Sequence, residues 1–304
     1  MDSLVVISGP TAVGKTEVSI RVAERLGCEI VSADSRQVYS EMPIGTAAPT
    51  EEQLARVPHH LVRCRSVRQP LNAFGFEHEA LSILPSVFQK GRGLALLSGG
   101  SMMYVDALCR GIDPMPDIPD ELRDDLKAQL AAHGLAPLVE RLQSLDPVYC
   151  QSADLRNPRR VLHALELCIV SGGPVSALRL GEPHPRPFRI LKFAILRPRD
   201  ELYARIDTRV DQMFADGLVD EARALFPLAD SLSSLNTVGY RELFSFFRGE
   251  YPIDEAIRLI KRNTRHYAKK QITWLKADPD YVFLSPDNAE ENILSAIANL
   301  NLLP

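Results

Sequence analysis

The stretch Gly9-Pro10-Thr11-Ala12-Val13-Gly14-Lys15-Thr16 decides how this chain folds. It fits the pattern G-x-x-x-x-G-K-[ST] at every fixed position. An apolar run, Leu4-Val5-Val6-Ile7, precedes it and an amphipathic run over residues 17–26 follows it, which predicts the order strand, glycine-rich loop, helix. The sequence therefore predicts a phosphate-binding loop (P-loop) at residues 9–16, and a purely structural glycine turn is the alternative.

The residue types in this loop suit an anionic ligand. Gly9 and Gly14 let the backbone turn its N–H groups and the helix N-terminus toward a phosphate. Lys15 adds a positive charge for the outer phosphate oxygens, and the Thr16 hydroxyl can bind Mg²⁺. The motif specifies a diphosphate or triphosphate, and it does not specify ATP.

Further apolar runs predict a parallel sheet around this loop. A strand over residues 29–33 ends at Asp34, and a strand over 94–97 ends in Ser98-Gly99-Gly100-Ser101. Residues 190–196 and 281–284 are further strand candidates, with helical patterns between the strands. This alternation indicates a P-loop NTPase-like α/β fold, a parallel sheet covered by helices. Ligands bind at the carboxyl ends of such strands, so Gly9, Asp34 and Gly99 are expected to converge.

Two proline clusters, at residues 114–116 and 183–187, bracket a segment of different composition. Helical periodicity dominates it, with helices expected over residues 120–133, 135–145 and 158–171. We therefore expect a first part of the core over residues 1–113, an all-helical insertion over 114–187, and the second part of the core over 188–304.

The composition is that of a globular protein. The chain has 304 residues, and its apolar stretches fall far short of the roughly 20 residues of a membrane helix. Its five Cys are odd in number and lack C-x-x-C spacing, which favours reduced thiols and a cytoplasmic location. These features predict no contact with a membrane.

The charge is unevenly distributed. The net charge of −4 at first argues against a nucleic-acid partner, since such proteins usually have a basic surface. Residues 256–277, however, contain seven Lys or Arg and no acid, which leaves −11 on the rest. Arg258, Arg262, Arg265 and Lys269 fall on one helical face. This face is either simply solvated or contacts RNA.

The P-loop alone leaves several functions open. A kinase normally has an aspartate at the end of a second apolar strand, whereas residues 98–101 here are Ser-Gly-Gly-Ser, although Asp34 could take that role. No guanine-reading N-K-x-D sequence occurs. An ATP-dependent small-molecule or nucleotide kinase is therefore one candidate, and an RNA-binding module with a nucleotide as its switch is another.

Several motifs beyond the P-loop closely resemble the tRNA dimethylallyltransferases of bacterial type. In chain order these are Ser32-Ala33-Asp34-Ser35-Arg36-Gln37-Val38-Tyr39, Ile44-Gly45-Thr46-Ala47, Gly99-Gly100-Ser101-Met102-Met103-Tyr104, Asn157-Pro158-Arg159-Arg160-Val161, Arg209-Val210-Asp211-Gln212-Met213, Val238-Gly239-Tyr240-Arg241 and Lys269-Lys270-Gln271-Ile272-Thr273-Trp274-Leu275. The resemblance implies transfer of a dimethylallyl group from dimethylallyl diphosphate to N6 of the adenosine just 3′ of certain tRNA anticodons. This reaction requires no ATP, and we expect Mg²⁺ as cofactor and a monomeric protein.

The same resemblance implies catalytic roles for Asp34, Ser101, Lys15 and Arg209. Asp34 is expected to orient N6 or to accept its proton, because an aromatic amine is a poor nucleophile. Arg209 is expected to bind the diphosphate. From the residues alone, Asp34 could be only a helix cap and Arg209 only a solvated arginine. Ser101 stands where the family usually has threonine, which keeps the hydroxyl and loses the methyl group.

The resemblance, together with the charge pattern, implies an extended contact with the tRNA anticodon stem-loop, whose target base has to leave its stack. The expected tRNA-binding residues are Asp34, Ser35, Arg36, Gln37, Ser101, Arg123, Arg159, Arg160, His163, Gly239, Tyr240, Arg241, Lys269, Lys270, Gln271 and Trp274.

Overall fold

The computed structural model describes residues 1–113, 115–178 and 184–300. It divides into two compact units. The core unit comprises Met1–Arg110 and Pro185–Pro304, and the insertion comprises Gly111–His184, so each boundary lies three residues before the one expected. Pro114 and Pro183, which belong to the two proline clusters, lie outside the described residues.

The core unit contains the elements β1 (Ser3–Ser8), α1 (Lys15–Leu26), β2 (Ile30–Ser32), α2 (Glu51–Arg56), β3 (His59–His60), α3 (Ala73–Lys90), β4 (Leu94–Gly99), α4 (Met102–Arg110), β5 (Arg189–Ile195), α10 (Arg199–Ala215), α11 (Leu218–Leu225), the 3₁₀ helices η1 (Phe226–Leu228) and η2 (Ser233–Leu235), α12 (Tyr240–Phe247), α13 (Ile253–Ala277), β6 (Tyr281–Leu284) and α14 (Ala289–Asn299). The insertion contains α5 (Asp120–His133), α6 (Ala136–Leu145), α7 (Pro147–Ser152), α8 (Pro158–Ser171) and α9 (Val175–Leu178).

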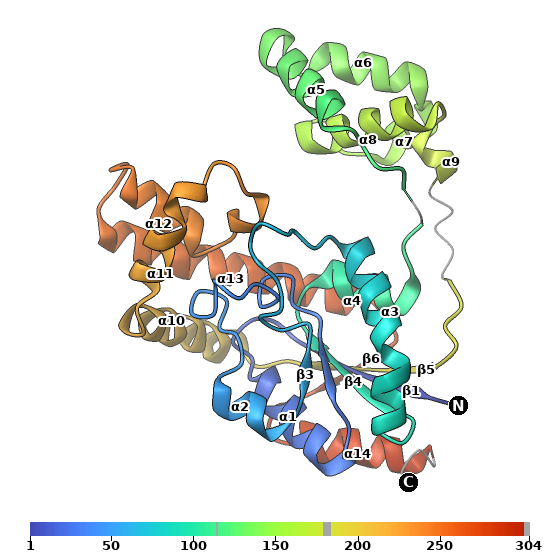
Figure 1. Ribbon diagram of the computed structural model, residues 1–304, viewed down its shortest axis with the longest axis vertical. Helices are drawn as coiled ribbons and strands as arrows, with labels where there is room; N and C mark the ends of the chain where they lie inside the picture. Colours follow the sequence, from blue (N-terminus) through green and yellow to red (C-terminus); the bar gives the residue numbers. More distant parts are fainter. Residues whose placement is uncertain (114, 179–183, 301–304) are drawn as a thin grey trace. The chain divides into compact units, whose positions relative to one another are not determined.

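The core is built on one parallel sheet in the order β3-β2-β4-β1-β5-β6. Side chains of β1 alternate between its two faces. Leu4 and Val6 pack with α3 and α4, whereas Val5 and Ile7 pack with α1, α10 and α14 (Figure 1). The predicted parallel sheet covered by helices is thereby confirmed, and β1 lies at its centre.

The P-loop needs glycine at both conserved positions. Gly14 caps α1 with a φ of 102°, which is costly for a residue with a Cβ. At Gly9, a Cβ would lie 2.8 Å from the carbonyl oxygen of Ile195 at the end of β5. These two restraints turn the chain sharply from β1 into α1.

A second apolar cluster lies within the core unit, where α10, α11, α12 and α13 meet. It includes Val38 and Met42 from the segment that follows β2, packed with Leu218 and Leu243. This packing holds the residues after Asp34 against the helices of the C-terminal part.

The insertion has its own apolar core. Leu126 of α5, Leu142 of α6 and Leu165 of α8 are all fully buried in it. The helices expected over 120–133, 135–145 and 158–171 are observed within one residue. None of the helices in the described part of the chain is long and apolar enough to cross a membrane.

Asp146 ties α7 to α9 inside the insertion, and we expect it to make the insertion sensitive to acid. Its carboxylate accepts the N–H of Tyr149 at 2.9 Å and both the N–H and the hydroxyl of Ser176 at 2.7 and 2.8 Å. Burial raises the pKa of this carboxyl, but the backbone donors outweigh burial and lower it overall. The stabilisation is therefore present at neutral pH and disappears as the pH falls through the lowered pKa.

We predict that Asp146→Asn lowers the free energy of unfolding of the insertion by about 1–3 kcal/mol at pH 7 and makes it less dependent on acid pH. Hydrogen exchange of peptides from α6 to α9 measures this change. The single Trp, Trp274, lies in the core unit, so its fluorescence serves as a control for core stability. Equal acid sensitivity in the two proteins would contradict the role of Asp146.

Candidate active site

The P-loop and the ends of β2 and β4 converge, as the sequence predicts. The N–H of Ser101 donates to the carbonyl of Ala33 at 3.1 Å, and the N–H of Ser35 donates to Ser101 Oγ at 2.8 Å. A Cβ on Gly99 would lie only 2.2 Å from the Ala33 oxygen, so the two chain segments touch through glycine. Asp34 is thus fixed between two strand ends, close to the P-loop.

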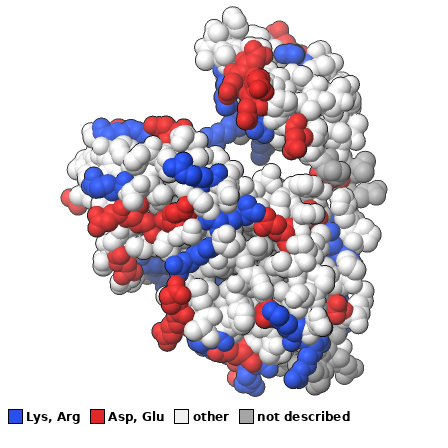
Figure 2. Space-filling model, viewed as in Figure 1, with Lys and Arg blue, Asp and Glu red and all other residues white. Residues whose placement is uncertain are grey.

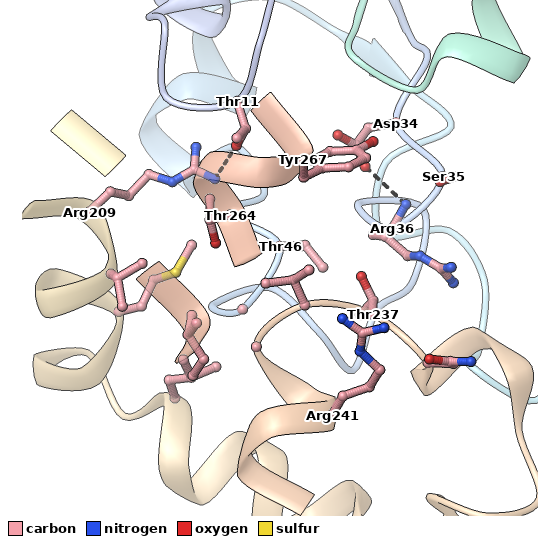
Figure 3. A pocket seen from close by; sticks show the side chains of 18 residues that line it. Thr11, Asp34, Ser35, Arg36, Thr46, Arg209, Thr237, Arg241, Thr264 and Tyr267 are labelled. Atoms are coloured by element: carbon pink, nitrogen blue, oxygen red, sulfur yellow. Dashed lines mark hydrogen bonds between the residues drawn. The ribbon is translucent and has the colours of Figure 1, made fainter. Parts of the chain in front are cut away.

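Asp34 has one oxygen engaged and one available. Its Oδ1 accepts the N–H of Arg36 at 2.9 Å (Figure 3) and the N–H of Gln37 at 3.2 Å, so Asp34 caps a turn at residues 35–38, whereas the alternative interpretation expected a helix there. Its Oδ2 has no hydrogen bond to any described residue, and Asp34 lines two cavities. The turn therefore orients the carboxylate while leaving one oxygen for a ligand.

Two cavities meet at Asp34. The smaller is the phosphate side, lined by Lys15, Thr16 and Ser98, and the larger, of about 350 Å³, is lined in part by apolar side chains. Both are lined by Thr11, Asp34, Thr46, Arg209 and Tyr267. The apolar side chains of the larger cavity are Val210, Met213, Leu218, Val238 and Ile260.

Two cations converge on the phosphate side. Lys15 Nζ donates to the carbonyl of Pro10 at 3.3 Å, and Arg209 Nη2 donates to Thr11 Oγ1 at 2.7 Å (Figure 3). Burial lowers the pKa of Lys15 to about 8, with Asp34 opposing and Arg209 adding to this effect. Burial also lowers the pKa of Arg209. Arg209 is thus part of the site and not a solvated helix residue.

Tyr267 of α13 was not among the expected site residues. Its ring lies beside Asp34 (Figure 3), and the residue lines both cavities. Burial, with a contribution from Asp34, raises the pKa of Tyr267 to about 12, so the hydroxyl stays protonated at neutral pH. Since the ring is still 37% exposed, it can also contact a ligand that enters beside Asp34.

The loop around Thr46 is held from both sides. Gln37 Nε2 donates to the carbonyls of Thr46 and Ala47 at 3.1 and 2.9 Å. The Glu221 carboxylate accepts the N–H of Gly45, the N–H of Ile44 and the Tyr240 hydroxyl at 2.8, 2.8 and 2.5 Å. No sequence pattern indicated this role for Glu221, because the two segments are far apart in the chain.

Comparison with known proteins identifies the family. The model of the IPP transferase family matches residues 37–278. The chain belongs to this family. It is 49% identical to a tRNA dimethylallyltransferase of Parabacteroides distasonis over 95% of this chain and 96% of that one. It is 47% identical to one of Bacteroides thetaiotaomicron over 100% and 98% of the two chains.

Solved structures agree with this assignment. A tRNA isopentenylpyrophosphate transferase of Bacillus halodurans has a TM-score of 0.73 at 33% identity, covering 98% of this chain and 96% of that one. A eukaryotic dimethylallyltransferase solved while acting on tRNA has a TM-score of 0.83, covering 99% of this chain and 79% of that one. At 22% identity, this second likeness supports the fold.

Among the tRNA contacts expected for this IPP transferase, two residues of the core are buried and a third, Trp274, is half-buried. Tyr240 is fully buried, with its hydroxyl on Glu221. Gln271 is 3% exposed, and its amide joins the Thr11 N–H to the Gly100 carbonyl at 2.9 and 2.8 Å. The Trp274 indole N–H donates to Asp106 at 2.8 Å. Tyr240 and Gln271 therefore differ from the expectation: they hold the site together from inside.

Ser101, also an expected tRNA contact, is 7% exposed and lines neither cavity, whereas the remaining expected contacts apart from Gly239 are at least partly exposed, and their roles stay predictions. Ser35, Arg36, Gly239 and Arg241 line the larger cavity. In the insertion, Arg159, Arg160 and His163 are exposed at the start of α8, and Arg123 is paired with Asp120. The expected tRNA contacts thus fall on both the core unit and the insertion.

The basic helix α13 is less positive than its sequence suggests. Arg258, Lys261 and Arg265 form ion pairs at 2.6 Å with Glu255, Asp211 and Asp207, respectively. Figure 2 shows acidic and basic side chains interleaved on the visible face of the core unit. Lys269 and Lys270 have no ion pair with a described residue, so they remain the stronger candidates for phosphate contacts.

Gly45 tests whether the Thr46 loop needs its close contact with Tyr240. A Cβ at Gly45 would lie 2.5–2.6 Å from the Tyr240 ring, so Gly45→Ala forces the loop away. We predict a loss of about 1–3 kcal/mol in stability and lower activity, because Thr46 lines both cavities.

Thermal unfolding and steady-state kinetics measure this effect. The matched control is Gly173→Ala, where an added Cβ has no atom of the described residues within 4 Å. If both variants unfold at the same temperature, the contact with Tyr240 does not restrain the loop.

Proposed function

We propose that this IPP transferase moves a dimethylallyl group from dimethylallyl diphosphate to N6 of the adenosine adjacent to the anticodon on its 3′ side in certain tRNAs, releasing diphosphate. The observation that carries the proposal is the free Oδ2 of Asp34 at the junction of a cationic cavity and an apolar one. The names and high coverage of the relatives support the same reaction.

The two cavities suit the two halves of the donor. The diphosphate lies against the P-loop amides, Lys15 and Arg209, and among the described residues Asp34 is the acid that acts on both cations. The five-carbon chain then points past Asp34 toward Val210 and Met213, whose apolar surfaces exclude water.

The reaction exchanges one bond to carbon for another. The C1–O bond breaks with its electron pair going to the diphosphate, while the N6 lone pair forms the new N–C bond. The proton on N6 passes to Oδ2 of Asp34, which its Oδ1 hydrogen bonds hold in place. Lys15 and Arg209 stabilise the negative charge that grows on the leaving diphosphate.

This site fits a Mg²⁺ ion that is coordinated partly by the protein and partly by the substrate diphosphate. Among the described residues, no group of three or more His, Cys, Asp or Glu could hold a metal ion by itself. The Thr16 hydroxyl lines the phosphate cavity beside Ser98, and Mg²⁺ commonly combines few protein ligands with phosphate oxygens and water. We infer that Thr16 holds Mg²⁺, which neutralises diphosphate charge when bound.

Incubation with Mg²⁺, dimethylallyl diphosphate and unmodified tRNA, followed by mass analysis of the nucleosides, tests the proposal. The expected product is adenosine heavier by one dimethylallyl group, formed without ATP. Phosphate transfer from ATP without this product would favour the kinase. RNA binding with neither product would favour the switch module.

Asp34→Asn separates the chemical role of Asp34 from its cap role. Asparagine keeps an oxygen for the N–H groups of Arg36 and Gln37 but cannot accept the N6 proton. We predict that kcat falls by about 10²- to 10⁴-fold while the Kd for tRNA changes little. Single-turnover kinetics and a filter-binding assay measure the two quantities, and near-normal turnover would exclude Asp34 as the base.

Lys15 makes donor binding sensitive to pH. Because burial lowers its pKa to about 8, the free enzyme loses this charge as the pH rises through 8. We predict that the Kd for dimethylallyl diphosphate increases above pH 8, approaching tenfold per pH unit. Calorimetry measures this, and Lys15→Arg, which stays charged, serves as the control. A flat Kd between pH 7 and 9.5 in the unmodified protein would contradict the prediction.

A cytoplasmic location and a monomeric state remain proposals. The tRNA substrate and the five unbridged cysteines support the first. Light scattering during size-exclusion chromatography determines the second.

A further inference from the structure

Three arginines hold three consecutive P-loop residues from the side of α10. Arg209 donates to Thr11 Oγ1 at 2.7 Å, Arg205 Nε donates to the Ala12 carbonyl at 2.9 Å, and Arg197 Nε donates to the Val13 carbonyl at 2.9 Å. Arg209 lines both cavities, whereas Arg197 and Arg205 line neither of them. Arg197 and Arg205 therefore act on the loop without reaching the ligand space.

The bond from Arg197 fixes the direction of one peptide group. In a trans peptide, the carbonyl of Val13 and the N–H of Gly14 point in opposite directions. Because Arg197 binds the carbonyl from outside, the Gly14 N–H is turned to the opposite side, where the N-terminus of α1 begins. This N–H belongs to the set that binds an anion in a P-loop.

Arg205 restrains the preceding peptide. Ala12 is a non-glycine residue with a φ of 65°, a conformation that persists only where its surroundings impose it. Arg205 holds the Ala12 carbonyl, and the N–H of the same peptide group, that of Val13, donates to the Pro10 carbonyl at 3.3 Å. The peptide is thus fixed at both ends.

Arg197, which precedes α10, is itself fixed because its Nη1 is paired with Glu201 in the first turn of that helix. The planar guanidinium can bind Val13 and Glu201 together, which a lysine could not do in the same geometry. Both Arg197 and Arg205 also bring an Nη2 to 3.8–3.9 Å from the position of a Cβ on Gly14.

We propose that Arg197 and Arg205 are positioning residues for the diphosphate: they hold the P-loop peptides in their anion-binding orientation before the donor arrives. This inference rests on the proposed function, since it takes the ligand of the loop to be a diphosphate.

Binding of inorganic diphosphate in the presence of Mg²⁺, measured by calorimetry, tests the inference on the full chain. We expect Arg197→Gln and Arg205→Gln each to weaken this binding by about 10- to 100-fold, and to raise the KM for dimethylallyl diphosphate. The Kd for tRNA should stay within twofold, because neither side chain lines the cavity beside Tyr267. A general loss of structure would instead weaken both ligands.

Arg199→Gln is the matched control for charge. Arg199 lies between the two positioning residues in sequence, but its guanidinium lies over the Tyr203 ring at 5.1 Å and not on the P-loop. We expect this variant to bind diphosphate like the unmodified protein. If it weakens binding as much as Arg197→Gln does, net charge and not peptide orientation is responsible, and the inference is wrong.

Conservative variants complete the test. Arg205→Lys keeps one donor and is expected to recover binding to within about fivefold, whereas Arg197→Lys loses the two-way contact and recovers less. These variants carry the test if a glutamine variant does not fold. Diphosphate binding within twofold of the unmodified protein in every variant would overturn the inference. If the variants bind diphosphate more weakly as expected but the unmodified protein does not prenylate tRNA, the proposed function is wrong and the inference about the P-loop stands.

Discussion

The contact between Gly99 and the Ala33 carbonyl is the constraint on which the site depends. It joins the ends of β2 and β4 so closely that no side chain fits between them. Asp34 directly follows Ala33, just beyond the end of β2. Ser101 lies two residues after Gly99, and its Oγ accepts the Ser35 N–H at 2.8 Å. The carboxylate is therefore placed by backbone contact between parallel strands, and its position does not depend on a flexible loop.

The positive charges of this site are neutralised only when an anionic ligand is bound. Lys15 and Arg209 are both buried near Asp34, and Arg205 adds a further positive charge beside Arg209, so among the described residues of the site cations exceed carboxylates. The lowered pKa of Lys15 expresses the cost of this arrangement. A diphosphate supplies the missing negative charge, and its release after transfer restores the imbalance. The excess of cations thus favours binding of the leaving group and stabilises the charge that develops on it.

The fold was largely predictable because its signals are local. The strand at residues 4–7 and the helices at 120–133 and 158–171 follow from apolar periodicity and lie within two residues of the observed elements. The burial of Gln271 and Tyr240 was not predictable, because the side of a helix that faces inward depends on distant segments. No pattern indicated α3, whose interior contains Pro85, or the ion pairs that neutralise three basic residues of α13.

The resemblance to the family predicts a threonine at position 101, where this chain has serine. A threonine has a stiff side chain whose rotamer is restricted by its methyl group, and serine lacks this restriction. Here, the Ser101 hydroxyl is instead fixed by Ser35: it accepts the Ser35 N–H at 2.8 Å and donates to the Ser35 hydroxyl at 3.1 Å. Ser35 follows Asp34 and lines the larger cavity, so the buried Ser101 holds the wall of that cavity from behind. The hydrogen bonds therefore fix the orientation of the Ser101 hydroxyl, which in a threonine the methyl group would help to restrict.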